Sequence, residues 1–185
     1  HSLNVAILLA NFAKHMGVNE EDVQELALSG FLHDIGKIVI PDSILLKPGR
    51  HTEAETKIMQ THVTEGIKMI DKMLGNFHFQ DFHHIGLLRD IILCHHEWYN
   101  GKGYPNGLKG EEIPIVGRIA AVADVFDALI SDRVYRKGWP FEEVVKYLQA
   151  GKGKQFDPDC VDALLKNEKK IKALLHKCKD TTVKL

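Results

Sequence analysis

The sequence is poor in the features that mark secreted and membrane-spanning proteins. Its three cysteines, Cys94, Cys160 and Cys178, are an odd number and form no Cys-x-x-Cys pair. This argues against a disulfide framework and for a reducing compartment. No apolar run approaches the roughly 20 residues that span a bilayer, and no basic signal-peptide region opens the chain. We therefore expect a cytoplasmic protein without a membrane segment.

An excess of charge of either sign is also absent. The 24 lysines and arginines nearly balance the 25 aspartates and glutamates, so the formal net charge is -1. No global field then attracts the protein to a nucleic acid polymer or an anionic membrane, and any anion binding should be local. With 185 residues, 44% of them hydrophobic, the chain can bury one core. One domain over residues 1–185 is expected.

A sustained strand pattern is missing as well, whereas apolar residues recur at spacings of three and four. This periodicity predicts an all-α fold. Asn19, the Thr52 to Glu55 capping box, Pro114, Pro140 and the pair Asp157-Pro158 mark helix starts, and Gly17, Gly36 and Gly75 mark ends. The expected helices cover residues 1–16, 19–35, 52–74, 84–96 and 114–130, with two shorter ones after Pro140 and Asp157, loops at 38–50 and 101–110, and a solvated lysine-rich helix at 166–184.

What the sequence does have is a series of histidines and aspartates on apolar helical backgrounds. They are His1, His33, Asp34, His62, His95, His96 and Asp124. A single His-Asp pair occurs by chance in many proteins, but this ordered series does not. Asp124 lies in the segment Ile119 to Ile130, which is apolar nearly all round and should be buried. A buried carboxylate must meet a cation or a metal ion.

Neighbouring residues on a helix point about 100° apart. His95 and His96 should therefore serve two neighbouring ions, or act as one ligand and one supporting group, which favours a site with several metals. The two oxygens of Asp34 could bridge two ions. Asp127 lies one turn after Asp124 and suits an acceptor that holds a histidine N–H or an arginine. A purely structural role for Asp127 is equally compatible with the sequence.

A site rich in imidazole with a few carboxylates suits iron, manganese, zinc, cobalt or nickel better than calcium. The lack of thiolate ligands argues against a closed structural zinc site, and we favour iron or manganese. Two such ions about 3.5 to 4 Å apart lower the pKa of a bridging water, hold phosphate oxygens and stabilise a leaving alkoxide. The series therefore predicts a metal-dependent phosphohydrolase.

The ordered motifs resemble those of the HD-GYP family, the HD-domain phosphohydrolases that hydrolyse cyclic di-GMP in bacteria. The naming residues are His33-Asp34 and Gly103-Tyr104-Pro105, and the similarity runs from His1 to about Leu165. The resemblance implies a compact multi-helix HD-domain bundle with the metal site in its centre. It makes the seven histidines and aspartates metal ligands, with Asp34 bridging.

The same resemblance assigns further residues to the substrate. Lys37 would lie near the bridging hydroxide and the scissile phosphate, where its charge could stabilise the transition state. Arg133 and Arg136 would contact a phosphate or guanine, although without the family they would be two solvated arginines. Gly103 and Pro105 would let the backbone approach the ligand, and Tyr104 would stack on a base or bond a phosphate.

Several questions stay open at this level. Members with three metals carry a glutamate one turn before the first histidine, upstream of His1, so two and three metals are both possible. The product could be pGpG or GMP, and the substrate could instead be another cyclic dinucleotide such as 3′,3′-cyclic GMP-AMP. A non-catalytic module that senses cyclic di-GMP or binds a GGDEF-type synthase is a third hypothesis. Most family members carry a sensor or receiver module, so we expect a fragment of a longer regulated protein.

Overall fold

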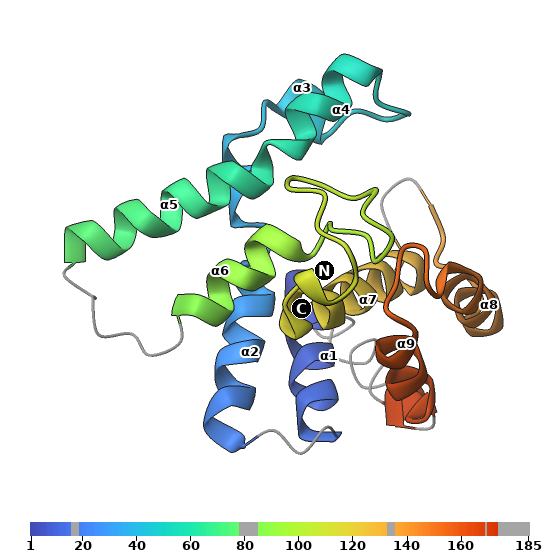
Figure 1. Cartoon of the computed structure of the whole chain (residues 1–185). Coiled ribbons are helices and arrows are strands. Elements are labelled where there is room, and N and C mark those ends of the chain that lie inside the picture. The colour runs from blue at the N-terminus through green and yellow to red at the C-terminus, as the bar shows by residue number, and fades with distance from the viewer. Residues whose placement is uncertain (16–18, 78–84, 133–135, 169, 174–185) are drawn as a thin grey trace, which may run out of the picture.

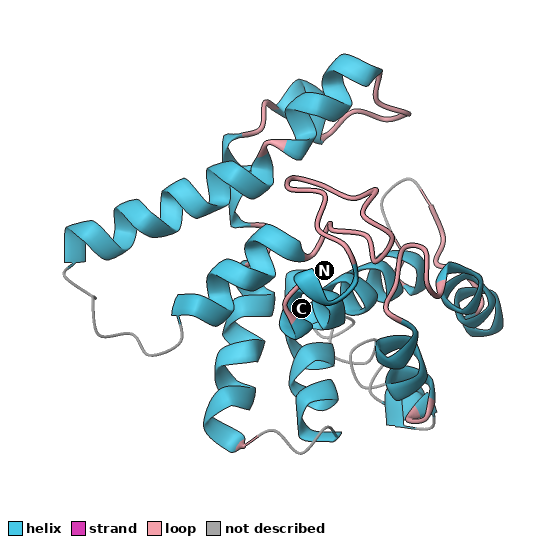
Figure 2. Cartoon of the chain, in the orientation of Figure 1, coloured by secondary structure: helices cyan, strands magenta, loops and turns pink. Residues whose placement is uncertain are grey.

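The computed structural model describes residues 1–15, 19–77, 85–132, 136–168 and 170–173, and within these residues it contains helices, turns and isolated bridges but no strand (Figure 1 and Figure 2). The all-α prediction is confirmed. The elements are α1 (Ser2–His15), α2 (Glu20–Leu32), η1 (Ile35–Val39), α3 (Asp42–Leu45), α4 (Glu53–Gln60), α5 (His62–Phe77), α6 (Ile85–Cys94), η2 (Gly110–Glu112), α7 (Ile115–Ile130), α8 (Phe141–Gly151) and α9 (Pro158–Leu165), where η marks 3₁₀ helices.

Helix starts follow the capping signals in the sequence. The Asn19 side chain accepts the backbone N–H of Asp22 before α2. Thr52 and Glu55 form the reciprocal capping box before α4. Asp157 caps α9, with proline at the first helical position. Each cap satisfies N–H groups that have no partner inside their own helix, which is why these boundaries could be predicted.

Several boundaries differ from the prediction. The expected helix 19–35 ends at Leu32, and Gly36 does not end a helix but lies inside η1. The expected loop 38–50 contains the short helix α3. The expected helix 52–74 is divided at Thr61, whose N–H and hydroxyl both bond to the Ile58 carbonyl, so that α5 starts afresh at His62. Gly75 does not end α5, which continues to Phe77. A single helical glycine costs about 1 kcal/mol, and the rest of the helix outweighs that cost.

Helix α7 is the centre of the hydrophobic core. It packs against α1, α6, α8 and α9, while α2 packs on α1 and α6 (Figure 1). Phe126 and Val122 of α7 are fully buried, as a helix that is apolar nearly all round requires. The lysine-rich segment 166–184 is described only as far as residue 173, and there Ile171 is buried in the same core. That part of the segment is therefore not only a solvated face.

A second part of the structure projects from this core. Figure 1 shows α3 and α4 together beyond one end of α5, and α5 runs outward past α6. Helix α5 packs against η1 and α6. None of the described helices is both long and apolar enough to cross a membrane.

The packing around α7 generates a stability prediction. Phe126 is fully buried and lies edge-on to Phe141, with 6.1 Å between ring centroids. Phe126→Ala should lower the free energy of unfolding by about 3 to 5 kcal/mol, because it leaves a cavity in a packed core. Phe31→Ala is the matched control, since Phe31 is 50% exposed, and it should cost about 0.5 kcal/mol. Urea denaturation followed by circular dichroism measures both, and equal losses would contradict this account of the core.

Candidate metal centre

Seven histidine and aspartate side chains converge in the middle of the bundle. They form two groups, in each of which the ligand atoms lie within 4.8 Å of one another. One group consists of Asp34, His62, His95 and His96, and the other of His1, His33 and Asp124. The structure therefore brings together all seven residues that the sequence singled out.

Helix ends place most of these side chains. His33 is the C-cap of α2, and Asp34 precedes η1. His62 is the first residue of α5, and His1 directly precedes α1. In Figure 1 the N-terminus lies in the middle of the molecule. His1 and several helix ends point inward here, so residues far apart in sequence meet.

The arrangement of His95 and His96 differs from one of the two predicted alternatives, in which they serve two neighbouring ions. Both belong to the group of Asp34 and His62, instead of facing two different ions, and their ring centroids are 4.1 Å apart. The expected helix 84–96 ends at Cys94, so the two histidines lie in the turn that follows α6. The divergence of neighbours in a continuous helix therefore does not apply to them.

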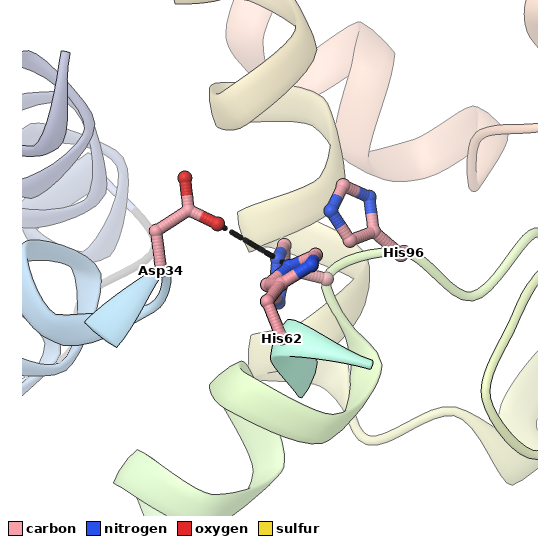
Figure 3. A group of neighbouring side chains, drawn as sticks. Asp34, His62 and His96 are labelled. Atoms are coloured by element: carbon pink, nitrogen blue, oxygen red, sulfur yellow. Dashed lines mark ion pairs between the residues drawn. The ribbon is translucent and has the colours of Figure 1, made fainter. Parts of the chain in front are cut away.

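Asp34 lies between the two groups. Its Oδ1 is 3.3 Å from His62 Nε2 and its Oδ2 is 3.2 Å from His33 Nε2. Figure 3 shows Asp34 directed toward His62, with His96 beside it. The two oxygens of one carboxylate thus face two different ligand groups, as a bridging ligand requires.

Backbone carbonyls orient three of the imidazoles. The Nδ1 atoms of His33 and His62 each lie 2.7 Å from the carbonyl oxygens of Gly30 and Met59. His95 Nδ1 lies within hydrogen-bond distance of two carbonyls at the end of α6. A carbonyl only accepts, so each Nδ1 carries a proton and donates it, and each Nε2 is the atom turned toward the centre.

Four buried polar atoms of the centre make no hydrogen bond. They are the Nε2 atoms of His33, His62 and His95, and Oδ1 of Asp34. Leaving such an atom unsatisfied costs about 1 to 3 kcal/mol. Imidazole nitrogens and carboxylate oxygens are ligands that divalent transition metals accept. The residues therefore fit divalent cations, which would satisfy all four atoms.

His1 is held by a hydrogen-bond network behind it. Its Nδ1 lies 2.7 Å from Asp127 Oδ2, while its Nε2 lies 3.0 Å from Asp124 Oδ1. The fully buried Asp127 also accepts the Asn4 amide and the Ser131 hydroxyl, each at 2.9 Å. The structure thus places Asp127 as the predicted acceptor of a histidine N–H. Asn4 and Ser131 were not predicted, and their only signal is helical spacing of three and four from His1 and Asp127.

Charges in the centre suit cation binding. Burial would raise the pKa of Asp34, but His33, His95 and Lys37 hold it far below its usual range. Burial lowers the pKa of His62 to about 4 and that of His96 well below its usual value. The carboxylate is therefore ionised and these two imidazoles are neutral at pH 7, which are the forms that bind metals.

The electrostatics of His1 are different. Burial would lower its pKa, but the hydrogen bonds and negative charges of Asp124 and Asp127 raise it to about 9. In the protein alone His1 is thus protonated at pH 7 and bridges the two carboxylates. A cation that binds Nε2 must displace this proton, so its affinity for this group should rise with pH.

Lys37 and Tyr104 border the centre. Lys37 Nζ lies 2.5 Å from Asp34 Oδ2, and the lysine side chain is only partly buried. The Tyr104 ring stacks on the His96 ring, with 4.7 Å between centroids. Only glycine fits at position 103, because a Cβ there would clash with the backbone nitrogen of Trp98 at 2.2 Å. The Gly-Tyr-Pro loop therefore packs directly against the backbone of residues 96–98, with Pro105 exposed.

Comparison with known proteins places this arrangement in a family. A family model described as "HD domain" matches residues 2–160. The chain belongs to the HD domain family. The resemblance to HD-GYP proteins is also confirmed, and a solved structure described as Bd1817, an HDG"Y"P protein from Bdellovibrio bacteriovorus, shares the fold. That structure has a TM-score of 0.69 and 22% sequence identity, and the match covers 91% of this chain and 51% of its own.

Curated relatives are more similar in sequence. The cyclic di-GMP phosphodiesterase response regulator RpfG of Xanthomonas campestris is 45% identical over 88% of this chain and 41% of its own length. The 3′3′-cGAMP-specific phosphodiesterase 2 of Vibrio cholerae is 39% identical over 90% of this chain and 31% of its own length. The HD domain chain thus spans less than half the length of these relatives.

The two arginines predicted to contact substrate have different outcomes. Arg133 lies outside the described residues. Arg136 donates from Nη2 to the Ala128 carbonyl at 2.5 Å, and its guanidinium lies over the Trp139 ring, 6.0 Å from the centroid. Arg136 is therefore tied to the end of α7 and is not a freely solvated arginine. A substrate contact by either residue stays a prediction.

The network behind His1 can be tested by metal binding. Asp127→Asn should weaken metal binding by about 10- to 100-fold, because an amide has only one acceptor oxygen for three donors: His1 on one side and Asn4 and Ser131 on the other. Isothermal titration with Mn²⁺ measures the affinity, and circular dichroism checks the fold. Asp159→Asn is the matched control, because Asp159 is exposed on α9. Equal affinities of the two variants would show that Asp127 does not support a metal ligand.

Proposed function

We propose that this HD domain is a metal-dependent phosphodiesterase that hydrolyses cyclic di-GMP to linear pGpG, with further cleavage to GMP as a second step. The observation that carries the proposal is the position of Asp34, whose two oxygens face two separate ligand groups. The ammonium group of the partly exposed Lys37 lies next to the same carboxylate. Relatives named cyclic di-GMP phosphodiesterases support the choice of substrate.

Two divalent cations, iron or manganese, are proposed for the centre. His62, His95 and His96 would hold one, while His1, His33 and Asp124 would hold the other, and Asp34 would bind both. When bound, such ions supply Lewis acidity and activate water at neutral pH. The carbonyls behind His33, His62 and His95 fix each ring, so these ligands need no reorientation.

Lys37 is proposed as the cation that meets the reacting phosphate. It is anchored by Asp34 yet remains partly exposed, so its remaining N–H groups can reach a ligand. Negative charge increases on the phosphoryl oxygens in the transition state, and a fixed ammonium stabilises that charge more than it stabilises the ground state. Lys37 should therefore act mainly on the chemical step.

The Gly-Tyr-Pro loop and the two arginines are proposed as substrate contacts. Tyr104 lies beside His96, where a base or a phosphate could reach both the ring and the centre. Arg133 and Arg136 follow α7, the helix that carries Asp124, and a guanidinium suits bidentate contact with a phosphate or a guanine. These contacts would hold the dinucleotide while its phosphodiester lies at the ligand groups.

A second candidate substrate is 3′,3′-cyclic GMP-AMP. The similarity to a Vibrio cholerae phosphodiesterase named for that substrate favours it. Both cyclic dinucleotides carry the same phosphodiester linkage, so the metal centre alone would not distinguish them. A non-catalytic module that senses cyclic di-GMP or binds a GGDEF-type synthase has less support, because all seven ligand-type residues are present and grouped.

The decisive experiment supplies the protein with Fe²⁺ or Mn²⁺ and incubates it with cyclic di-GMP, 3′,3′-cyclic GMP-AMP and cyclic di-AMP separately. Chromatography of the products should show pGpG from cyclic di-GMP, and a chelator should abolish the reaction. Turnover of 3′,3′-cyclic GMP-AMP without turnover of cyclic di-GMP would establish the second candidate. Binding of cyclic di-GMP without any hydrolysis would establish the sensing module.

Two substitutions separate metal binding from transition-state stabilisation. Asp34→Ala should abolish turnover and lower the metal content, because both ions lose a ligand. Lys37→Ala should keep its metal and lower kcat by about 100-fold with little change in KM. Lys47→Ala is the matched control, because Lys47 pairs with Glu55 away from the centre. Elemental analysis and steady-state kinetics test this, and full metal and turnover in Asp34→Ala would refute the assignment.

A further inference from the structure

Glu97 is a buried carboxylate beside the metal centre that the proposed chemistry does not use. It directly follows His96 and is only 2% exposed. Its Oε1 accepts the backbone N–H groups of Asn106 at 2.7 Å and Gly107 at 3.1 Å, and its Oε2 accepts that of Leu108 at 3.1 Å. Hydrogen bonds to a charged acceptor are about twice as strong as neutral ones. They offset the cost of burying this carboxylate.

Backbone hydrogen bonds hold the two ends of this loop, from the Gly101 N–H to the Trp98 carbonyl and from the Gly110 N–H to the Tyr99 carbonyl, whereas the N–H groups of residues 106–108 between them go to Glu97. None of residues 101–110 is buried, so hydrophobic burial cannot fix its shape. Gly107 has a φ of +68°, a conformation that glycine adopts without strain and that turns successive N–H groups to one side. The carboxylate of Glu97 therefore provides the acceptors around which this part of the loop folds.

The same loop reaches a proposed metal ligand. The Tyr104 N–H donates to the His96 carbonyl at 3.2 Å, and the Tyr104 ring lies nearly parallel to the His96 ring, at 23°. His96 and Glu97 are neighbours in sequence. Glu97 thus holds the residues that follow Tyr104 in the loop, while His96 contacts Tyr104 itself.

We infer that Glu97 is a positioning residue: it holds the loop of residues 101–108 so that Tyr104 stays against His96 and forms one wall of the substrate site. This inference rests on the proposed function for the identity of the substrate. The position of the loop itself does not depend on that identity. Glu97 would act on substrate binding through Tyr104, without touching the substrate.

The test replaces Glu97 by glutamine, whose amide nitrogen cannot accept a hydrogen bond. E97Q should raise the exchange rate of the amides of residues 106–108 about tenfold or more, as expected for the loss of one hydrogen bond to a charged group. KM for cyclic di-GMP should rise by a similar factor. The metal content should stay at the wild-type value, and kcat should change by less than about twofold.

E112Q is the matched control. Glu112 is an exposed glutamate that accepts a backbone N–H at the far end of the same loop, from Lys109 at 2.9 Å. E112Q should leave KM and amide exchange at 106–108 unchanged. An equal rise of KM in E97Q and E112Q would overturn the inference, since it would show a general sensitivity of the loop to lost charge.

A double variant tests whether Glu97 acts through Tyr104. Tyr104→Leu removes the ring but keeps the three N–H groups that Glu97 accepts. Adding E97Q to Tyr104→Leu should then raise KM little further, since coupled residues are not additive. If the KM increases of the two substitutions multiplied fully in the double variant, Glu97 would not act through Tyr104, and the inference would be overturned. Loss of metal or of helical circular dichroism in E97Q would also overturn the inference, because Glu97 would then support the domain as a whole.

Amide exchange and metal content need no turnover. A wild-type protein that fails to hydrolyse cyclic di-GMP would therefore refute the proposed function, while unchanged exchange at residues 106–108 in E97Q would refute the positioning role. The two failures are distinguishable by these measurements.

Discussion

Buried ligand atoms without a partner are the constraint on which the arrangement of this bundle depends. The Nε2 atoms of His33, His62 and His95 and one oxygen of Asp34 make no hydrogen bond in the protein itself. Together they oppose folding by several kcal/mol unless a cation meets them. Carbonyls near the ends of α2, α4 and α6 hold these imidazoles by Nδ1 and so keep Nε2 directed at the centre. Folding and cation binding should therefore be linked, with the metal stabilising the folded state.

Local signals explain why much of the fold could be predicted. Asn19, Thr52 and Asp157 satisfy N–H groups within three residues of themselves, so their sequence context already contains the interaction. The division of the helix at Thr61 was missed because its two bonds to the Ile58 carbonyl are local alternatives to the helical pattern that the apolar spacing does not indicate. Gly75 was given too much weight, because one glycine opposes a helix only weakly.

In the candidate site, too, some features follow from the sequence and others depend on the folded structure. Its ligands could be predicted because histidine and aspartate on apolar backgrounds are costly without a cation, whatever their neighbours. The grouping of His95 with His96 could not, since it depends on α6 ending two residues earlier than predicted. Glu97 and Asn4 act through the backbone of a loop and through a buried carboxylate. The partners of Glu97 lie 9 to 11 residues away in an irregular loop, and Asp127 lies 123 residues from Asn4, so the sequence does not show either pairing.

The construction of the centre also bears on substrate choice. In the proposed function its side chains meet metal ions and a phosphodiester, and cyclic di-GMP and 3′,3′-cyclic GMP-AMP carry the same linkage. Discrimination between guanine and adenine must then come from groups that meet the bases, and the loop around Tyr104 is adjacent to the centre. A loop without buried side chains can change sequence without disturbing the core. One metal centre can therefore serve relatives with different cyclic dinucleotide substrates, provided that a buried anchor such as Glu97 keeps the loop in place.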